Sequence, residues 1–265
     1  MSTFYFRCAS TATETMFVPG EEAVGPWAPD MMHGRFLGGL AARQIEADHV
    51  DPGQRVARLT VDLFRAAPLE PVTVSSTVVR DGRRIRVVDT EVRVGEVHAA
   101  AVRAVILRCG DEPTGTIWQG PRWQSPPPET LPRFDPPEDA PRPPGEPAWD
   151  IRRHEGGFRT GERARVWTNE TGQLVDGEPV SPLVRAALSA DLASPLANGS
   201  DLGVAYINAD YTLAMARYPM GTWVGLETQN HLASEGIALG ECTLYDLDGP
   251  FATSVTTALA NPMLS

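Results

Sequence analysis

The chain has 265 residues, of which 42% are hydrophobic and 22% are charged, and its formal net charge is −11. This composition is typical of a globular protein with one large or two modest domains. A surface this acidic disfavours general binding to nucleic acids or anionic membranes, and no apolar run is long enough to span a bilayer. All 23 residues counted as Lys or Arg are arginine, which excludes chemistry based on lysine.

The three cysteines, Cys8, Cys109 and Cys242, lie far apart in the sequence. They form neither a paired disulfide framework nor a Cys-x-x-Cys site, which indicates a reducing compartment. The first residues also lack the basic and then apolar order of a secretion signal. We therefore expect a cytoplasmic protein.

Alternating apolar residues and turn signals predict a regular order of elements in the first 110 residues. Two strands are expected first, then one helix, and then four strands that form a meander. Asp81-Gly82 and Gly95 mark two of the turns. The predicted strands cover residues 4–10, 14–19, 55–67, 71–81, 83–94 and 96–108, and the predicted helix covers residues 29–48.

A break in composition follows at residues 111–148, which are too rich in proline for a helix or an interior strand. We interpret this segment as an extended linker between two domains, residues 1–110 and residues 149–265. It contains three large aromatic side chains, among them Trp123. We therefore expect the linker to pack on the body of the protein.

The same order of elements then repeats after the linker, about 150 residues further along the chain. The two halves are not alike in their letters, but they are alike in the order and spacing of their elements. This pattern indicates a duplication. The predicted strands cover residues 156–161, 164–170, 203–216, 221–232, 236–247 and 250–260, and the predicted helix covers residues 181–197.

One helix followed by a long antiparallel meander requires the sheet to curl around the helix, because the helix must bury its apolar side on the concave face. A single unit of this kind, the hotdog fold, leaves one sheet edge open and normally pairs with a second copy. Here both copies lie in one chain. The sequence therefore predicts an α+β protein with two helix-wrapped antiparallel sheets joined into one continuous sheet, a double hotdog.

The segment HGRFLGGLAARQIEAD carries a His-Gly pair that leads into a glycine-rich apolar helix, and in this it resembles the helix motif of the thioesterase superfamily. In the second half, SADLASPL and YINADYTL resemble the helix and the next strand of the acyl-CoA thioesterase II family, and GECTLYDLDGPFATSVTTAL resembles its closing hairpin. The resemblance implies a double hotdog that hydrolyses acyl-CoA or acyl-carrier thioesters in fatty acid metabolism, without a cofactor.

In that family an Asp on the second helix, a Thr on the next strand and a Gln on the last strand hold the hydrolytic water. By resemblance, the Asp corresponds to Asp191 and the Thr position corresponds to Asn208. The Gln position corresponds to Thr257, or to Thr256 if the hairpin is shifted by one residue. Asn and Thr side chains can still hydrogen-bond a water molecule. The resemblance thus implies a catalytic group of Asp191, Asn208 and Thr257.

Asp191 is also singled out by the helical pattern alone. Ser181 is a favourable N-cap and Pro182 a favourable first helical residue. At about 3.6 residues per turn, the apolar residues of the helix form one arc, and Asp191 falls near its middle. A carboxylate on a buried stripe is costly unless it is paired or hydrogen-bonded. Asp191 is therefore either a satisfied structural acid or a catalytic base.

Free N–H groups at a helix start can stabilise a thioester oxygen as it becomes negative. Gly34 and Arg35 are the candidate amide donors, and His33 is a candidate substrate-binding residue; the alternatives are a simple turn glycine and a structural histidine. Gln44 occupies nearly the position of Asp191 in the first helix. An amide cannot act as a base, so Gln44 is either a site component or an amide that hydrogen-bonds the backbone between the halves.

The densest basic cluster lies at residues 80–86. Arg80, Arg83 and Arg84 are candidates for binding the phosphates of CoA, because guanidinium groups fit phosphate oxygens; alternatively, they belong to a solvated hairpin. The histidines are scattered without metal-ligand spacing, and no Gly-x-Ser-x-Gly or nucleotide-binding motif is present. We expect neither a metal nor a cofactor.

The leading hypothesis is hydrolysis of an acyl-CoA or acyl-carrier thioester by a water molecule that Asp191 activates. One alternative is a non-catalytic protein that binds acyl thioesters or lipids on the same scaffold. Another is a dehydratase-type tailoring enzyme. We also expect a homo-oligomer, because hotdog sheets commonly pack further through their faces.

Overall fold

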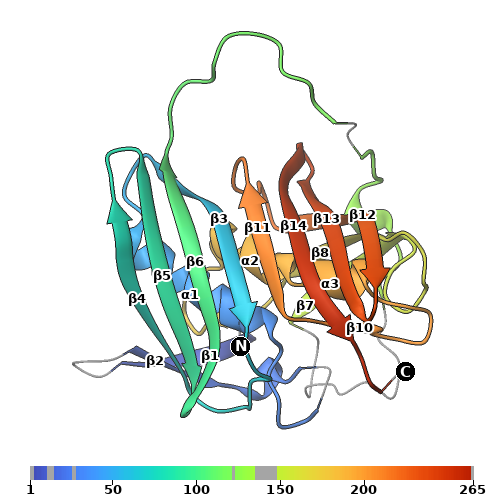
Figure 1. The fold of residues 1–265 in the computed structure, drawn as a ribbon, viewed down its shortest axis with the longest axis horizontal. Helices are drawn as coiled ribbons and strands as arrows, with labels where there is room; N and C mark the ends of the chain where they lie inside the picture. Colours follow the sequence, from blue (N-terminus) through green and yellow to red (C-terminus); the bar gives the residue numbers. More distant parts are fainter. Residues whose placement is uncertain (1–2, 11–14, 26–27, 121–122, 135–147, 264–265) are drawn as a thin grey trace.

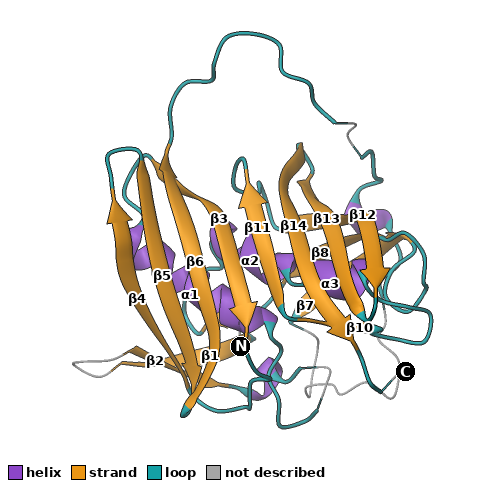
Figure 2. Cartoon of the chain, in the orientation of Figure 1, coloured by secondary structure: helices purple, strands orange, loops and turns teal. Residues whose placement is uncertain are grey.

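The computed structural model describes residues 3–10, 15–25, 28–120, 123–134 and 148–263. Its strands form one 14-stranded sheet, and the helices lie on the concave side of that sheet (Figures 1 and 2). The sheet runs in the order β7-β8-β12-β13-β14-β11-β3-β6-β5-β4-β2-β1-β9, with β10 paired to β14. No helix in these ranges is both long and apolar enough to cross a membrane.

The first half contributes six strands, the helix α1 and one short 3-10 turn. The strands β3 to β6 form the predicted antiparallel meander, and β1 and β2 form a hairpin that extends it beyond β4. The elements are β1 (Phe4–Ser10), β2 (Thr15–Pro19), the turn η1 (Glu21–Ala23), α1 (Arg35–His49), β3 (Gln54–Leu63), β4 (Val72–Asp81), β5 (Ile85–Val94) and β6 (Val97–Arg108).

The second half repeats this plan with two shorter helices in place of one. Its elements are β7 (Trp149–Glu155), β8 (Arg165–Glu170), β9 (Gln173–Val175), α2 (Pro182–Ala190), α3 (Ala193–Ala197), β10 (Tyr206–Asn208), β11 (Asp210–Met215), β12 (Trp223–Ser234), β13 (Ile237–Asp246) and β14 (Gly249–Ala260). The structure thus has the predicted α+β architecture, a double hotdog.

Two pairings join the halves into one sheet. β3 pairs with β11 in the middle, where Thr60 lies opposite Thr212. At the far edge, β9 of the second half pairs in parallel with β1 of the first half, with Phe4 opposite Gln173. The central pair makes the sheet continuous, as the sequence predicts, and the pair of β9 with β1 connects the two halves a second time at its edge.

The core lies between the sheet and the helices, and α1 and α2 pack against each other there. Two glycines of α1 make this close approach possible. A Cβ on Gly38 would lie 1.8 Å from the hydroxyl oxygen of Tyr211, and a Cβ on Gly39 would lie 2.6 Å from Leu188 Cδ2. Larger side chains at these positions would separate the helices from each other and from the sheet.

Four predicted elements differ from the structure. The strand expected at 203–216 is divided into β10 and β11. Residues 156–161 form no strand; Gly156, Gly157, Arg159 and Gly161 all have positive φ, which a strand does not allow. The helix expected at 29–48 begins only at Arg35. The helix expected at 181–197 is interrupted after residue 190 and is divided into α2 and α3.

The described part of the linker is anchored on the second half. The Trp123 ring stacks on the Trp167 ring at a centroid distance of 5.2 Å, and the Phe134 and Phe158 rings lie 5.3 Å apart. By contrast, the segment after β6 arches away from the sheet (Figure 1), and Trp118 in this segment is 84% exposed. Packing on the body is therefore seen at Trp123 and Phe134 but not at Trp118.

Candidate active site

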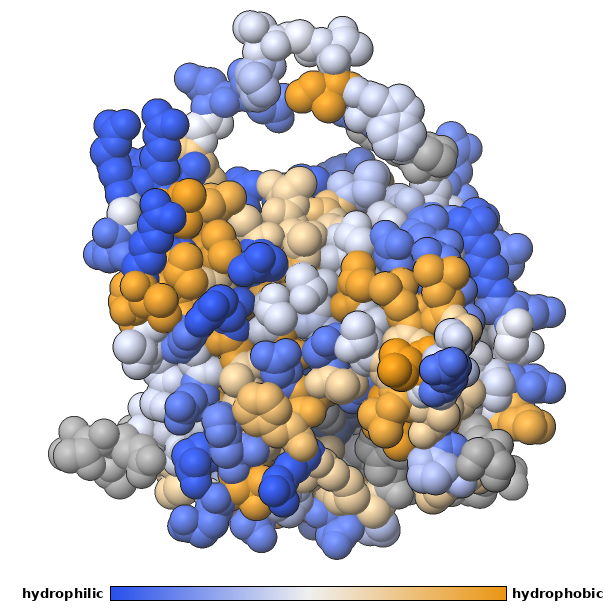
Figure 3. Space-filling model, in the orientation of Figure 1, coloured by the Kyte–Doolittle hydropathy of each residue, from blue (hydrophilic) through white to orange (hydrophobic). Residues whose placement is uncertain are grey.

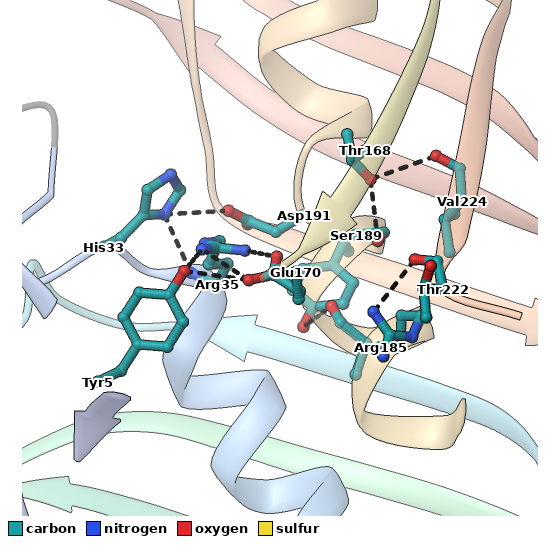
Figure 4. A network of polar contacts seen from close by, with 12 residues as sticks. Tyr5, His33, Arg35, Thr168, Glu170, Arg185, Ser189, Asp191, Thr222 and Val224 are labelled. Carbon is teal, nitrogen blue, oxygen red and sulfur yellow. Dashed lines mark hydrogen bonds and ion pairs between the residues drawn. The ribbon is translucent and has the colours of Figure 1, made fainter. Parts of the chain in front are cut away.

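Asp191 lies at the break between α2 and α3, and its side chain is buried, with 5% of the residue exposed. The Ser181 hydroxyl accepts a hydrogen bond from the Val184 amide and so caps the start of α2, as the sequence predicts. After Ala190 the chain leaves the regular helix, and the carboxylate points toward the start of α1 (Figure 4). The helix break therefore places one acidic group between the two halves.

Asn208 holds one oxygen of this carboxylate. Its Nδ2 donates a hydrogen bond of 2.9 Å to Asp191 Oδ1. Asn208 is the last residue of β10, a short strand paired with the end of β14. The structure therefore brings together two of the predicted catalytic residues, and Asp191 Oδ2 is left for other partners.

His33 approaches the second carboxylate oxygen from the loop before α1. Its Nδ1 lies 3.7 Å from Asp191 Oδ2 and accepts a hydrogen bond of 3.3 Å from the Arg35 amide (Figure 4). Burial, with a further contribution from the Arg35 charge, lowers the pKa of His33 to about 3. His33 is therefore neutral near pH 7 and carries its proton on Nε2, so that Nδ1 and Oδ2 face each other as two acceptors.

The ionisation of Asp191 reflects opposing effects. Burial raises the pKa of its carboxyl. The hydrogen bond from Asn208 and the positive charge of Arg35 act in the opposite direction, but the pKa remains above its ordinary value. A carboxylate with a raised pKa is a stronger base than an exposed one. The neutral imidazole of His33, whose pKa is lowered to about 3, is a weaker base than this carboxylate.

Arg35, the first residue of α1, is the centre of a buried polar cluster (Figure 4). Its guanidinium binds both oxygens of Glu170 on β8, and its Nη2 donates a hydrogen bond of 3.0 Å to the hydroxyl of Tyr5. The guanidinium carbon also lies 4.3 Å from the centre of the Trp149 ring. Arg35 and Glu170 are buried, so this ion pair fixes the start of α1 against the second half.

The other proposed oxyanion and binding residues are placed differently. The Arg35 amide, expected as an oxyanion donor, is used by His33 Nδ1. Gly34 is the N-cap of α1 and adjoins His33. Gln44 lies further along α1, where it accepts a hydrogen bond from Arg43 and donates one of 2.6 Å to Asp48. Gln44 is therefore part of a helix surface, since it bonds within α1.

Thr257 is not in contact with Asp191. Its hydroxyl donates a hydrogen bond of 2.7 Å to Asp210, and the residue is exposed on the outer face of the sheet. The side chains of a strand alternate between its two faces. The neighbouring Thr256 is accordingly buried on the helix side, where its hydroxyl accepts a hydrogen bond of 3.2 Å from Asn198. Thr256, the alternative position that the sequence left open, is therefore the one whose side chain faces the helices.

The arginines proposed for CoA phosphates are far from Asp191. The hairpin with Arg83 and Arg84 follows Arg80, which lies opposite Val87 on the outer face of the sheet. Arg86, at the start of β5, donates a hydrogen bond to the carbonyl of His49 at the far end of α1. At about 1.5 Å per residue, α1 separates the hairpin from the candidate site by about 20 Å.

Tyr5 and Glu170 are site residues that the sequence did not indicate. They are 165 positions apart, and their hydrogen bond of 3.0 Å joins β1 to β8. Nothing in the sequence indicates that Tyr5 and Glu170 are in contact, because their contact depends on how the two halves pack together. Within the described residues, no group of three or more His, Cys, Asp or Glu side chains is arranged to hold a metal ion.

Comparison with known protein families identifies both halves of the chain. Residues 23–109 match the acyl-CoA thioesterase N-terminal domain, and residues 128–260 match the acyl-CoA thioesterase C-terminal domain. The chain therefore belongs to the acyl-CoA thioesterase family, whose chemistry is the hydrolysis of thioesters.

Solved structures support the fold assignment. The tesB protein of Mycobacterium avium subsp. paratuberculosis is similar with a TM-score of 0.71 and 13% identity over 96% of both chains. The acyl-CoA thioesterase II TesB2 of Mycobacterium marinum has a TM-score of 0.65 and 16% identity, over 96% of this chain and 95% of that one. A hot dog protein of Alicyclobacillus acidocaldarius has a TM-score of 0.72 and 15% identity over the same shares. A search of curated protein sequences found no match.

Proposed function

We propose that this protein hydrolyses acyl-CoA or acyl-carrier thioesters with a water molecule held between Asp191 and His33. The observation that carries the proposal is the pair of facing acceptors, Asp191 Oδ2 and His33 Nδ1, 3.7 Å apart. One water molecule can donate a hydrogen bond to Asp191 Oδ2 and a second one to His33 Nδ1, which it would share with the Arg35 amide. Its oxygen lone pairs then point away from both acceptors and toward a substrate.

In the proposed reaction, the water oxygen attacks the thioester carbonyl carbon while Asp191 takes the proton of the water. Asn208 holds the other carboxylate oxygen and so fixes the orientation of the base. The carbonyl oxygen becomes negative, and the Gly34 amide is the proposed donor to it. The C–S bond then breaks, and the proton passes from Asp191 to sulfur, which gives a free acid and a thiol.

A second candidate function is binding of an acyl thioester without hydrolysis. Two of the three positions that hold water in the family are altered here, since Asn208 and Thr257 replace Thr and Gln. Thr257 also faces away from Asp191 and bonds to Asp210 instead. Both differences favour binding without hydrolysis. A binding protein would hold acyl-CoA and release no thiol.

Thiol release from acyl-CoAs of increasing chain length distinguishes the two functions. We expect turnover by the wild type and a loss of about 100-fold or more in kcat for Asp191→Asn, which keeps the shape but removes the base. Asp48→Asn removes an exposed carboxylate at the end of α1 and should leave turnover unchanged. Near-normal turnover by Asp191→Asn would refute the role of Asp191, and tight binding without turnover by the wild type would favour the binding protein.

A further inference from the structure

The two halves of the sheet correspond residue by residue. Val61 pairs with Val102 in the first half, and Leu213 pairs with Ser254 in the second half, each 152 positions later. The same offset carries the pairs of β5 with β6 onto those of β13 with β14. Each residue of one half of the sheet can therefore be compared with its counterpart in the other.

The helices do not correspond in the same way, because the second helix is broken at Asp191, whereas α1 runs without a break from Arg35 to His49. Pro195 explains the break. A proline has no N–H to donate to the carbonyl four residues earlier, and its ring clashes with that carbonyl. The residue four positions before Pro195 is Asp191, whose carbonyl accepts a hydrogen bond of 3.2 Å from the Ser194 amide instead. No proline lies within α1.

Side chains of the sheet bind the carbonyl groups at the end of α2. The last four carbonyls of any helix lack an intrahelical donor. The hydroxyl of Ser254, on β14, donates a hydrogen bond of 2.9 Å to the Ala190 carbonyl. The hydroxyl of Tyr211, on β11, donates a longer one of 3.4 Å to the Ala187 carbonyl. These two residues therefore hold the last turn of α2, directly before Asp191.

Both hydroxyls lie on the helix side of the sheet, and both residues are completely buried. The outer face of the sheet, which Figure 3 shows, carries polar and apolar side chains side by side. On the helix side the buried side chains are mainly apolar, so a hydroxyl there is unfavourable unless it has a partner. A Cβ on Gly38 of α1 would lie 1.8 Å from the Tyr211 hydroxyl oxygen. This glycine therefore leaves the space that the hydroxyl occupies.

The counterparts of these two residues in the first half have no hydroxyl. Leu59 takes the place of Tyr211, and Val102 takes the place of Ser254. Both counterparts are buried, and the helix of their half is unbroken. The hydroxyls therefore accompany the break in the helix and are not a general requirement of the fold.

Tyr211 can act here only as a hydrogen-bond donor. Burial, and then the negative charge of Asp191, raise the pKa of its phenol well above the ordinary value. The hydroxyl therefore keeps its proton near neutral pH and cannot serve as a base. Its contribution to the site is one of geometry.

We propose that Ser254 and Tyr211 are positioning residues, which hold the break of α2 and so fix the backbone that presents the Asp191 carboxylate to the site. Asn208 holds the carboxylate itself, so the backbone and the side chain of Asp191 are both held from the sheet of the second half. This role rests on the proposed function, in which Asp191 takes the proton of the water. Loss of either hydroxyl should let the end of α2 shift and move the base away from its reactive position.

Thiol release from an acyl-CoA measures the effect of each hydroxyl. Ser254→Ala and Tyr211→Phe each remove one hydroxyl and little else. Because a small displacement of a catalytic group slows a reaction strongly, kcat should fall about tenfold in Ser254→Ala and about threefold in Tyr211→Phe, whose hydrogen bond is longer, while KM stays within about twofold. Ser76→Ala and Tyr218→Phe are matched controls, because each loses a hydroxyl that is hydrogen-bonded to the first half. Both controls should keep the wild-type kcat.

A double-variant comparison separates positioning from general damage. In the Asp191→Asn background, Ser254→Ala should not lower the residual kcat further, because the base that the hydroxyl positions is already absent. The proposal is overturned by an equal fall in kcat in both backgrounds, by single variants that keep the wild-type kcat, or by controls that lose as much.

Hydrogen exchange tests the same break without any substrate. The amides of residues 191–194 include those that bond across the break, and Ser254→Ala should raise their exchange rates at least about threefold by easing local opening. Ser76→Ala should leave these rates unchanged. If the wild type releases no thiol, the proposed function fails, but faster exchange would still show that the hydroxyls hold the break. Exchange at the break that equals that of the wild type overturns the proposal in either case.

Discussion

The two halves of the chain share one plan but differ at the position where a base could act. In the first half, α1 continues through Gln44 to His49, and Gln44 bonds to Asp48 on the helix surface. In the second half, the helix breaks at Asp191, and the carboxylate is buried beside Asn208. The counterpart of Asn208, 152 positions earlier, is the buried apolar Val56.

This difference shows that duplication of a fold does not duplicate its site. The first half supplies the start of α1, with His33 and Arg35, and the second half supplies Asp191, Asn208 and Glu170. The candidate site is therefore composite, because each half supplies a different part of it. The four predictions below test this division of labour, beginning with the largest expected effect.

Making the second half like the first should abolish turnover. Asp191→Gln is expected to lower kcat for thiol release by about 100-fold or more, because an amide cannot accept the proton of water. Gln44→Asp in the same protein should not restore activity, because Gln44 bonds to residues of α1 and not to those of the site. Recovery of activity in that double variant would show that the first half contains a second usable site.

Removing the ion pair that joins the halves should cost about 3–5 kcal/mol of unfolding free energy. Arg35→Met leaves Glu170 buried without its cation, and urea unfolding measures the loss. Arg103→Met breaks the exposed pair with Asp89 and should cost much less unfolding free energy than Arg35→Met, because water screens an exposed ion pair. Equal losses in the two variants would contradict the role assigned to burial.

Gly38→Ala should destabilise the protein by about 1–3 kcal/mol, because its Cβ would overlap the hydroxyl of Tyr211 on β11. Gly110→Ala is the matched control, since no atom lies within 4 Å of a Cβ built there and no positive φ is involved. Thermal unfolding of both variants provides the measurement. A stable Gly38→Ala protein would mean that α1 can move away from the sheet.

Asn208→Val replaces the hydrogen-bond donor with the residue found at its counterpart, Val56. The hydrogen bond from Asn208 lowers the pKa of Asp191 against the effect of burial. Its loss should raise that pKa further, so a higher pH is needed to ionise the base. The acid limb of the kcat/KM profile should therefore move to higher pH, and a limb that stays in place would exclude this hydrogen bond from the tuning of Asp191.

The order of the elements could be predicted because strand alternation, helix periodicity and turn residues are local. The strand predicted at 156–161 was wrong because its glycines have positive φ and form a loop. The sequence alone does not show whether a glycine lies in a strand or in such a loop. The pairing of Asp191 with Asn208 followed from the family resemblance. The cluster of Tyr5, Arg35 and Glu170 could not be predicted, because it depends on how two distant segments are brought together.

The parallel pairing of β9 with β1 has a consequence for the continuity of the chain. Together with the central β3–β11 pair, it ties the halves at two separate places in the sheet. The arch around Trp118 is then only a tether, which raises the local concentration of one half near the other. A backbone cut in the exposed residues 111–120 should leave a nicked protein that remains assembled, and the two fragments should complement each other when produced separately.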